Sequence, residues 1–186
     1  MDRLTIFERL RADHAGVLAE LDAIEALLDE ARAAATATGT AGPEPLRLPL
    51  RALERLSGFA VHLEAQFATH LAAEDEVLYP ALTARLDNGR ELTAPLHAEH
   101  RELRAMLATL LLTLARPASA ARDEQLAVQA RDLVDLLRIH IRKEEALLFG
   151  VAERLLPPCD LTELEARREP SGAPANGSSH PKKGSV

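Results

Sequence analysis

The sequence predicts an all-α protein: an antiparallel, up-down four-helix bundle followed by a disordered C-terminal tail. Apolar residues make up 47% of the 186 residues and aromatic residues only 3%, with Ala, Leu, Arg and Glu dominant. This composition is typical of helices rather than of half-buried strands. Apolar side chains also recur at steps of three and four, the period of one helix face. A chain of this length is expected to form one compact domain.

Two helices are expected in the first part of the chain. The first carries its apolar period over residues 7–28, and a stretch rich in Thr, Gly and Pro over residues 36–45 marks a loop. The second helix carries the same period over residues 56–77. Pro80 is expected to kink or end it, because proline lacks an amide hydrogen and crowds the preceding turn.

Two further helices follow a turn at Asn88-Gly89. The third carries its period over residues 96–114 and is expected to end at Arg116-Pro117. The fourth spans residues 126–151, and Pro157-Pro158 stops it. Four long helices joined by short connections pack as antiparallel neighbours.

The bundle domain is expected to cover residues 1–158, and residues 159–186 form a C-terminal extension. From about Glu169 onward the extension consists of Pro, Gly, Ser, Asn and Lys without an apolar period, and it includes His180. Such a segment has too little apolar surface to fold, so the extension is expected to be largely disordered.

Charge and cysteine content exclude several classes of protein. The net charge of −7 comes without a basic stripe, which argues against nucleic acid as a partner. No stretch approaches the ~18 uninterrupted apolar residues of a membrane span, and the N-terminal residues lack the basic-then-apolar pattern of a signal segment. The single cysteine, Cys159, has no partner for an internal disulfide, which favours a cytoplasmic location.

The chain contains a weak internal repeat centred on histidine. Of seven histidines, six precede residue 141. The His-x-x-x-Glu pair at 70–74 aligns with the pair at 140–144 at an offset of 70 residues (140 − 70), and His14 aligns with His100 at an offset of 86 (100 − 14). Each half therefore supplies one His followed by a His-x-x-x-Glu pair, which predicts a site with approximate two-fold symmetry.

The repeated residues are candidate metal ligands because they stand at seam positions, where Leu is normal and a charged group is costly. Residues four apart on a helix differ by about 40° in direction and roughly 6 Å along the axis, so both members of each pair reach one interior point. Two inward carboxylates repel each other unless cations lie between them. Four imidazoles with two carboxylates suit iron, manganese or zinc. The six candidates are His14, His70, Glu74, His100, His140 and Glu144.

A single seam histidine is more often a hydrogen-bonded core residue than a ligand. Six inward residues at matching depths on four helices, duplicated between the two halves, favour a metal site instead.

These residues resemble the HHE cation-binding branch of the hemerythrin family, over residues 3–156. Its pattern is a His on the first helix, His-x-x-x-Glu-Glu before Leu-Phe/Tyr-Pro on the second, Glu-His on the third and His-x-x-x-Glu-Glu on the fourth. The matching segments are Asp13-His14, His70-Leu-Ala-Ala-Glu74-Asp75-Glu-Val-Leu-Tyr-Pro, Glu99-His100 and His140-Ile-Arg-Lys-Glu144-Glu145-Ala-Leu-Leu-Phe.

The resemblance implies a bridged pair of iron ions, with Mn or Zn as possible substitutes. It implies that Glu74 and Glu144 bridge the ions while the histidines bind terminally. Oxygen-carrying members use a fifth histidine, four residues before the His of the third helix. That position is Leu96 here, with His97 beside it. His97 points about 60° away from His100 on an ideal helix, so it is a further metal ligand, a residue that contacts a ligand, or a surface residue.

Other residues near the expected site are expected mainly to have surface or supporting roles. His62 is expected at an exposed rim. Tyr79 and Phe149, which align at the offset of 70 residues (149 − 79), are expected to cover one end of the site, with Tyr79 a candidate for electron transfer or a hydrogen bond. Asp75, Glu76 and Glu145 are expected to lie on solvated helix faces, although an acidic residue beside a ligand could form a hydrogen bond to a ligand. Cys159 is expected to be structural or idle.

Two classes of function compete on such a scaffold. The first is reversible binding or sensing of O₂ or a related small oxidant, such as peroxide or nitric oxide, and this is the class we favour. The second is redox catalysis: decomposition of peroxide or nitric oxide, oxidation of iron, or donation of iron to damaged clusters. Four histidines leave more open coordination positions than five, which tilts the site toward chemistry. A third possibility is a metal-dependent regulatory module. The sequence identifies no protein partner.

Overall fold

The computed structural model describes residues 5–37 and 45–168. The prediction of an all-α protein is confirmed for these residues, which contain no strand. None of their helices is long and apolar enough to cross a membrane. Most of the expected loop at 36–45 and the tail from Glu169, including His180, lie outside the described residues. The elements are α1 (Ile6–Ala37), α2 (Leu50–Gln66), η1 (Phe67–Leu71), η2 (Glu74–Leu78), α3 (Tyr79–Arg85), α4 (Gly89–Leu114), α5 (Ala120–Lys143), η3 (Glu144–Leu148), α6 (Phe149–Leu155) and α7 (Pro158–Arg168).

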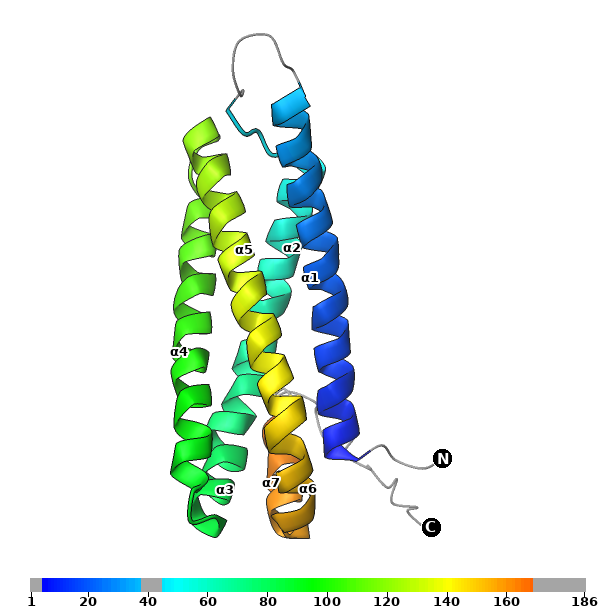
Figure 1. The fold of residues 1–186 in the computed structure, drawn as a ribbon, viewed down its shortest axis with the longest axis vertical. Coiled ribbons are helices and arrows are strands. Elements are labelled where there is room, and N and C mark those ends of the chain that lie inside the picture. The colour runs from blue at the N-terminus through cyan, green and yellow to red at the C-terminus, as the bar shows by residue number, and fades with distance from the viewer. Residues whose placement is uncertain (1–4, 38–44, 169–186) are drawn as a thin grey trace, which may run out of the picture.

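Long helical segments lie side by side along most of the molecule (Figure 1). The helix that begins with α2 continues through η1 and η2 into α3, and the helix that begins with α5 continues through η3 into α6. In Figure 1 the chain ascends along α1, returns along α2 and α3, ascends along α4 and returns along α5 and α6. Helix α1 contacts α2 and α5, and α4 contacts the same two helices.

Three turns of these long helices are π-helical rather than α-helical: η1, η2 and η3. π-helical turns inside α-helices are rare and occur mostly at functional sites. All three contain candidate metal ligands, namely His70, Glu74 and Glu144. Periodicity in the sequence predicts where a helix runs but does not reveal these wider turns.

Pro80 does not end the second long helix, which continues to Arg85. The proline lies in the first turn of α3, directly after η2, and the first turn of a helix tolerates a missing amide hydrogen. Helix α4 then starts at Gly89, where a Cβ atom would lie 2.6 Å from the carbonyl oxygen of Leu82 and from the Cα of Thr83. Glycine is required there because the two helices meet backbone to backbone.

The hydrophobic core is divided into two clusters along the length of the molecule. One contains Leu21, Leu63, Leu103 and Leu133, and the other surrounds Tyr79 nearer the N-terminal end of α1. The candidate ligands lie where the chain passes from one cluster to the other: on α1, for example, His14 separates Leu10 of one cluster from Val17 of the other. A polar layer therefore interrupts the core, and all six of its residues are buried.

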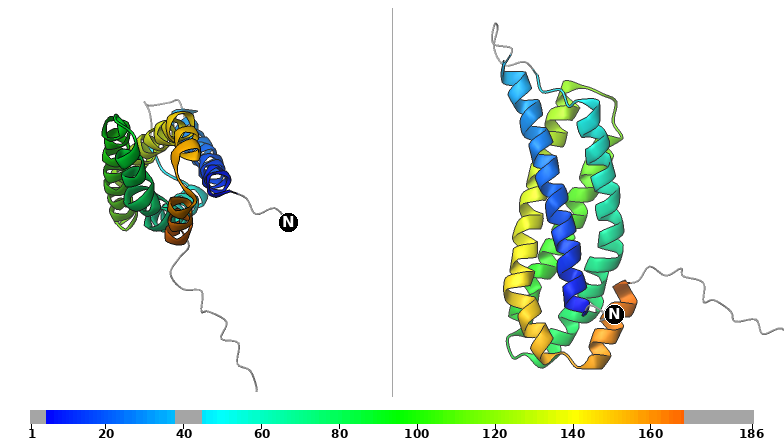
Figure 2. Two further views of the ribbon diagram at one scale, coloured as in Figure 1. Left: turned by 90° about the horizontal axis from the view of Figure 1, so that it is seen from below. Right: turned by 90° about the vertical axis from the view of Figure 1, so that its right-hand side faces the viewer.

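Helix α7 was not expected from the sequence. It covers the start of the expected C-terminal extension, and the rest of that extension lies outside the described residues. It packs against η1, η2 and α1, near the N-terminal end of α1 (Figure 2). Leu164 is fully buried in the cluster around Tyr79, and ion pairs join Glu165 to Arg9 and Asp160 to Arg85. Only Leu161 and Leu164 of this short segment pack against the cluster, which is too weak a period for a helix prediction.

Candidate metal centre

The structure brings the six candidate ligands together from all the long helices. They form two groups, and within each group one ligand atom per residue lies within 4.8 Å of the others. Both groups contain Glu74 and Glu144, and each adds two histidines of its own. The first group is His14, His70, Glu74 and Glu144; the second is Glu74, His100, His140 and Glu144. The two groups of possible ligands adjoin each other and share both carboxylates.

The histidines of each group face each other through Nε2. The Nε2 atoms of His14 and His70 are 3.2 Å apart, and those of His100 and His140 are 3.0 Å apart. At these distances two unprotonated nitrogens repel unless a cation lies between their lone pairs, and at most one of them can carry a proton. The arrangement therefore suits a metal ion beside each pair.

The two carboxylates lie between the histidine pairs. In Glu74, Oε1 is 3.2 Å from Nε2 of His70 and Oε2 is 3.7 Å from Nε2 of His100. In Glu144, Oε2 is 3.3 Å from Nε2 of His14 and 3.4 Å from that of His140.

The hydrogen-bonding state of these carboxylate oxygens indicates whether a metal ion fits the site. Both oxygens of Glu74, and Oε2 of Glu144, are buried and accept no hydrogen bond among the residues that the structure describes. A buried anionic oxygen without a donor is costly, and a cation satisfies it. Together with four inward imidazole nitrogens, these oxygens form a donor set that iron, manganese or zinc accepts.

Each of the four histidines also meets a carboxylate on its outer side, through Nδ1. An Nδ1–H that donates to a carboxylate holds the ring in place and directs the lone pair of Nε2 inward, as in many metal sites. Each outer carboxylate directly precedes or follows a candidate ligand of a different helix, so the contacts form a ring around the molecule. The pairs are His70–Asp13 at 3.3 Å, His100–Asp75 at 2.8 Å, His140–Glu99 at 3.1 Å and His14–Glu145 at 3.1 Å.

The sequence predicts Asp75 and Glu145 on solvated faces, with an acidic neighbour able to hydrogen-bond a ligand, and it predicts no function for Asp13 or Glu99. Glu145 is indeed exposed and Asp75 is half-buried, yet both bond to imidazoles. The available signal was the acidic residue directly beside His14, Glu74, His100 and Glu144 in the sequence.

His97 does not join the converging atoms. Its Nδ1 is 2.8 Å from Oδ1 of Asp75, the same oxygen that His100 contacts, and its side chain is 36% exposed. Asp75 also pairs with Arg104 at 2.9 Å. Burial alone would raise the pKa of the Asp75 carboxyl, but His100 and Arg104 outweigh it and lower the pKa to about 2. The carboxylate of Asp75 therefore lies between His97 and the candidate ligand His100.

Electrostatic interactions inside the cluster shift two further groups. Burial would lower the pKa of His70, but Glu74 and Asp13 raise it to about 10. Burial would raise the pKa of Glu144, but His140 and His14 lower it to about 2. The cluster therefore holds buried charges of both signs close together.

Aromatic rings cover one side of the site, as expected. Phe149 stacks on His14 with ring centroids 5.4 Å apart, and Tyr79 stacks on His100 at 5.2 Å. The hydroxyl of Tyr79 donates to Oε1 of Glu144 at 2.6 Å. Burial, together with the carboxylates of Glu74 and Glu144, raises the pKa of this hydroxyl far above its usual range.

His62 lies apart from these residues. Its imidazole contacts Glu20 at 3.0 Å and Gln66 at 3.2 Å, and it is 40% exposed, in agreement with a position at the rim. Cys159 is a free, exposed thiol at the start of α7.

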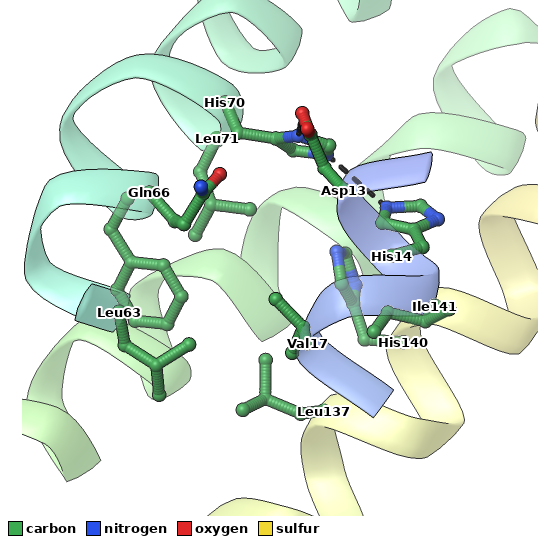
Figure 3. Close-up of a pocket in the computed structure, with 11 residues that line it drawn as sticks. Asp13, His14, Val17, Leu63, Gln66, His70, Leu71, Leu137, His140 and Ile141 are labelled. Carbon is green, nitrogen blue, oxygen red and sulfur yellow. Dashed lines mark hydrogen bonds and ion pairs between the residues drawn. The ribbon is translucent and has the colours of Figure 1, made fainter. Parts of the chain in front are cut away.

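A small cavity of about 30 Å³ adjoins the histidines (Figure 3). His14, His70 and His140 border it, and most of its remaining lining is apolar. About 10–15 Å³ suffices for one water molecule, whereas pockets for organic ligands occupy hundreds of Å³. The cavity therefore has room for a water-sized or diatomic molecule. Its apolar lining consists of Val17, Leu63, Phe67, Leu71, Leu137 and Ile141.

Long helices around a buried layer of four imidazoles and two shared carboxylates define a helical domain of the cation-binding class. A family model, the hemerythrin HHE cation binding domain, matches residues 5–152. The chain therefore belongs to the hemerythrin HHE cation-binding family, and helix α7 lies beyond the matched residues. No curated protein matches the chain.

Proposed function

We propose that the protein is a non-haem di-iron hemerythrin-like protein that binds or senses O₂ or a related small oxidant. In this proposal the long helices are the antiparallel four-helix bundle of the family, and the cytoplasm, where the lone thiol of Cys159 stays reduced, is its location. The observation that carries the proposal is the pair of ligand groups sharing Glu74 and Glu144.

Six residues of this chain would hold the two metal ions. His14 and His70 would bind one ion, His100 and His140 the other, and the two glutamates would bridge them, in agreement with the buried carboxylate oxygens that lack donors. Iron is favoured by membership of the family, and manganese and zinc accept the same donors. Bound iron would supply electrons and open coordination positions for a small oxidant.

The surroundings of the site support a diatomic or similarly small ligand. The cavity of about 30 Å³ adjoins the histidines and has a mostly apolar lining. Such a lining excludes water and thereby limits proton delivery to a bound oxidant. The apolar clusters on both sides of the polar layer isolate it further.

A redox enzyme at the same site is the second candidate, and Leu96 is the residue that favours it. Oxygen carriers of the family place their fifth histidine at this position, whereas Leu96 is buried and cannot bind metal. The smaller donor set leaves additional coordination positions for turnover of peroxide or nitric oxide.

Optical spectroscopy of the anaerobically reduced iron protein tests both candidates. A carrier develops an absorption band with O₂ and loses it under vacuum, while a catalyst consumes peroxide or nitric oxide over many cycles. With Leu96 in place of histidine, we expect poor reversibility: O₂ oxidises the protein within minutes to a stable di-ferric form. An O₂ adduct that lasts for hours and reverses under vacuum contradicts this expectation. A protein that reacts with none of the three oxidants contradicts the proposed function.

A further inference from the structure

Tyr79 breaks the approximate two-fold symmetry of the candidate metal centre. In the repeat, Tyr79 and Phe149 occupy equivalent positions at the offset of 70 residues (149 − 79). Each ring stacks on the histidine contributed by the helix that lacks a His-x-x-x-Glu pair: Tyr79 on His100, and Phe149 on His14. The two halves of the site therefore have matching rings, but only one of these rings carries a hydroxyl group.

The hydroxyl of Tyr79 occupies one oxygen of Glu144. Tyr79 is fully buried, and its Oη lies 2.6 Å from Oε1 of Glu144 and 3.1 Å from Nε2 of His100. A hydrogen bond of 2.6 Å to a carboxylate is short and charge-assisted. The other oxygen, Oε2, faces both halves of the site, at 3.3 Å from Nε2 of His14 and 3.4 Å from Nε2 of His140.

Glu74 has no comparable partner. Neither of its oxygens accepts a hydrogen bond among the described residues, and each faces a different half: Oε1 faces His70 and Oε2 faces His100. The two His-x-x-x-Glu motifs of the repeat therefore present their carboxylates differently. Glu74 directs one oxygen to each half. Glu144 directs Oε2 to both halves, while its Oε1, bonded to Tyr79, lies 4.0 Å from Nε2 of His100.

We propose that Tyr79 is a positioning residue whose hydroxyl, by donating to Oε1 of Glu144, holds that carboxylate so that Oε2 faces the histidines of both ligand groups. The proposal rests on the proposed dinuclear centre. Tyr79 remains a phenol and is not itself a metal ligand. The two ligand groups, although built from repeated sequence motifs, thereby have different surroundings, because Glu74 presents a different oxygen to each group.

Zinc binding followed in the near ultraviolet tests the state of Tyr79 directly. Tyr79 is the single tyrosine of the chain and there is no tryptophan, so the near-ultraviolet phenol bands report on this residue. Zn²⁺ is colourless and redox-inert, and it accepts the same donors as iron. We expect two zinc ions to bind while the absorption remains that of a phenol. Phenolate absorption that grows in proportion to bound zinc would show that Tyr79 is a ligand, and would overturn the proposal.

Tyr79→Phe tests the positioning role, because it removes the hydroxyl and keeps the ring. Loss of an outer partner of a metal ligand typically weakens metal binding by about 10–100-fold, and we expect an effect of that size on zinc affinity. Infrared spectra should also show a shifted carboxylate stretch, because Oε1 of Glu144 loses its donor. Circular dichroism verifies that the variant is folded.

Incorporation of 3-fluorotyrosine provides the matched control, since it modifies Tyr79 alone and keeps the hydroxyl. We expect this protein to bind zinc as tightly as the unmodified chain. If Tyr79→Phe binds zinc as tightly as the wild type, with an unshifted carboxylate stretch, the positioning role is refuted while the dinuclear centre stands. If the wild-type chain binds no zinc at all, the dinuclear centre fails and this proposal fails with it.

Discussion

The individual candidate ligands are distinguished by atoms that the rest of the chain leaves unsatisfied. Inward Nε2 atoms come within 3.0–3.2 Å of one another in pairs, and both oxygens of Glu74 and Oε2 of Glu144 accept no hydrogen bond from the described residues. A residue of the ordinary core finishes its hydrogen bonds within the protein. The histidines bond to carboxylates on the outer side through Nδ1, and Tyr79 donates to Oε1 of Glu144 on the inner side. The other inner nitrogen and oxygen atoms face one another, where a cation would satisfy them.

Glu74→Ala and Glu144→Ala are expected to reduce the metal content from two ions per chain to one or none, because each carboxylate is shared by both ligand groups. His97→Ala is the control, because His97 contacts Asp75 and not the converging atoms. It should retain both ions. Elemental analysis of the purified proteins measures the outcome. Loss of an ion from His97→Ala, together with full content in Glu144→Ala, would show that the ligand assignment is wrong.

The stability of the metal-free protein should depend on pH through His70 and Glu144. The pKa of His70 rises on folding from 6.5 to about 10, so its stabilising effect is complete below pH 6.5 and is lost as the pH rises through 10. The pKa of Glu144 falls from 4.5 to about 2, so its effect is complete above pH 4.5 and is lost as the pH falls through 2. The free energy of unfolding should be highest between about pH 4.5 and 6.5.

Urea denaturation of chelator-treated protein over a series of pH values measures this dependence. His70→Gln should flatten the decline on the alkaline side and leave the acidic side in place. Stability that rises from pH 6.5 to 10 would contradict the raised pKa of His70.

Helix α7 shows at the scale of the element how a segment beyond the family match contributes to the site. It packs on η1 and η2, the two π-helical turns that carry His70 and Glu74. Leu164 on α7 is buried in the apolar cluster around Tyr79. The position of α7 makes it a support for the ligand-bearing turns.

Leu164→Ala should therefore destabilise the protein by about 2–5 kcal/mol, the usual cost of truncating a buried Leu. Calorimetry should show a fall in the melting temperature of roughly 2–4 °C for each kcal/mol. Leu155→Ala is the matched control, because Leu155 at the end of α6 is 42% exposed, and it should change the melting temperature little. Equal effects of the two substitutions would show that α7 does not hold the ligand-bearing turns.

Deletion of residues 170–186 is expected to leave the metal content and the melting temperature nearly unchanged, because this stretch has no apolar period to bury. A fall of more than about 5 °C, equivalent to ~1–2 kcal/mol, would show that the tail docks on the helices.

At the scale of the whole molecule, a polar layer divides the core, so metal binding and folding should be coupled. The layer separates two apolar clusters and holds six buried ionisable residues, including carboxylate oxygens that accept no hydrogen bond from the described residues. A ligand that binds the folded state at 100 times its Kd stabilises it by about 2.7 kcal/mol, which corresponds to a rise of roughly 5–10 °C in melting temperature. Addition of Zn²⁺ to the chelator-treated protein should produce a rise of this size. The double variant with Glu74→Ala and Glu144→Ala should not respond; an equal rise in that variant would place the metal elsewhere.

The fold class could be predicted from the sequence because helix periodicity is local information. Steps of three and four identify the buried face of each helix, and the repeat at offsets of 70 and 86 residues identifies the six inward residues as a set. In the structure, the ligand atoms of these six residues lie close together in two groups. These properties depend on which face of a helix a residue occupies, and spacing along the chain specifies that face.

Which atoms meet in the site depends on how the helices pack against one another. His14 bonds on its outer side to the carboxylate of Glu145 from another helix, and the hydroxyl of Tyr79 donates to one oxygen of Glu144. The π-helical turns at the ligands and the docking of α7 were likewise invisible in the sequence. Each of these features depends on the relative rotation and axial shift of neighbouring helices, which packing of side chains distant in sequence determines. Periodicity within one helix contains no information about that register.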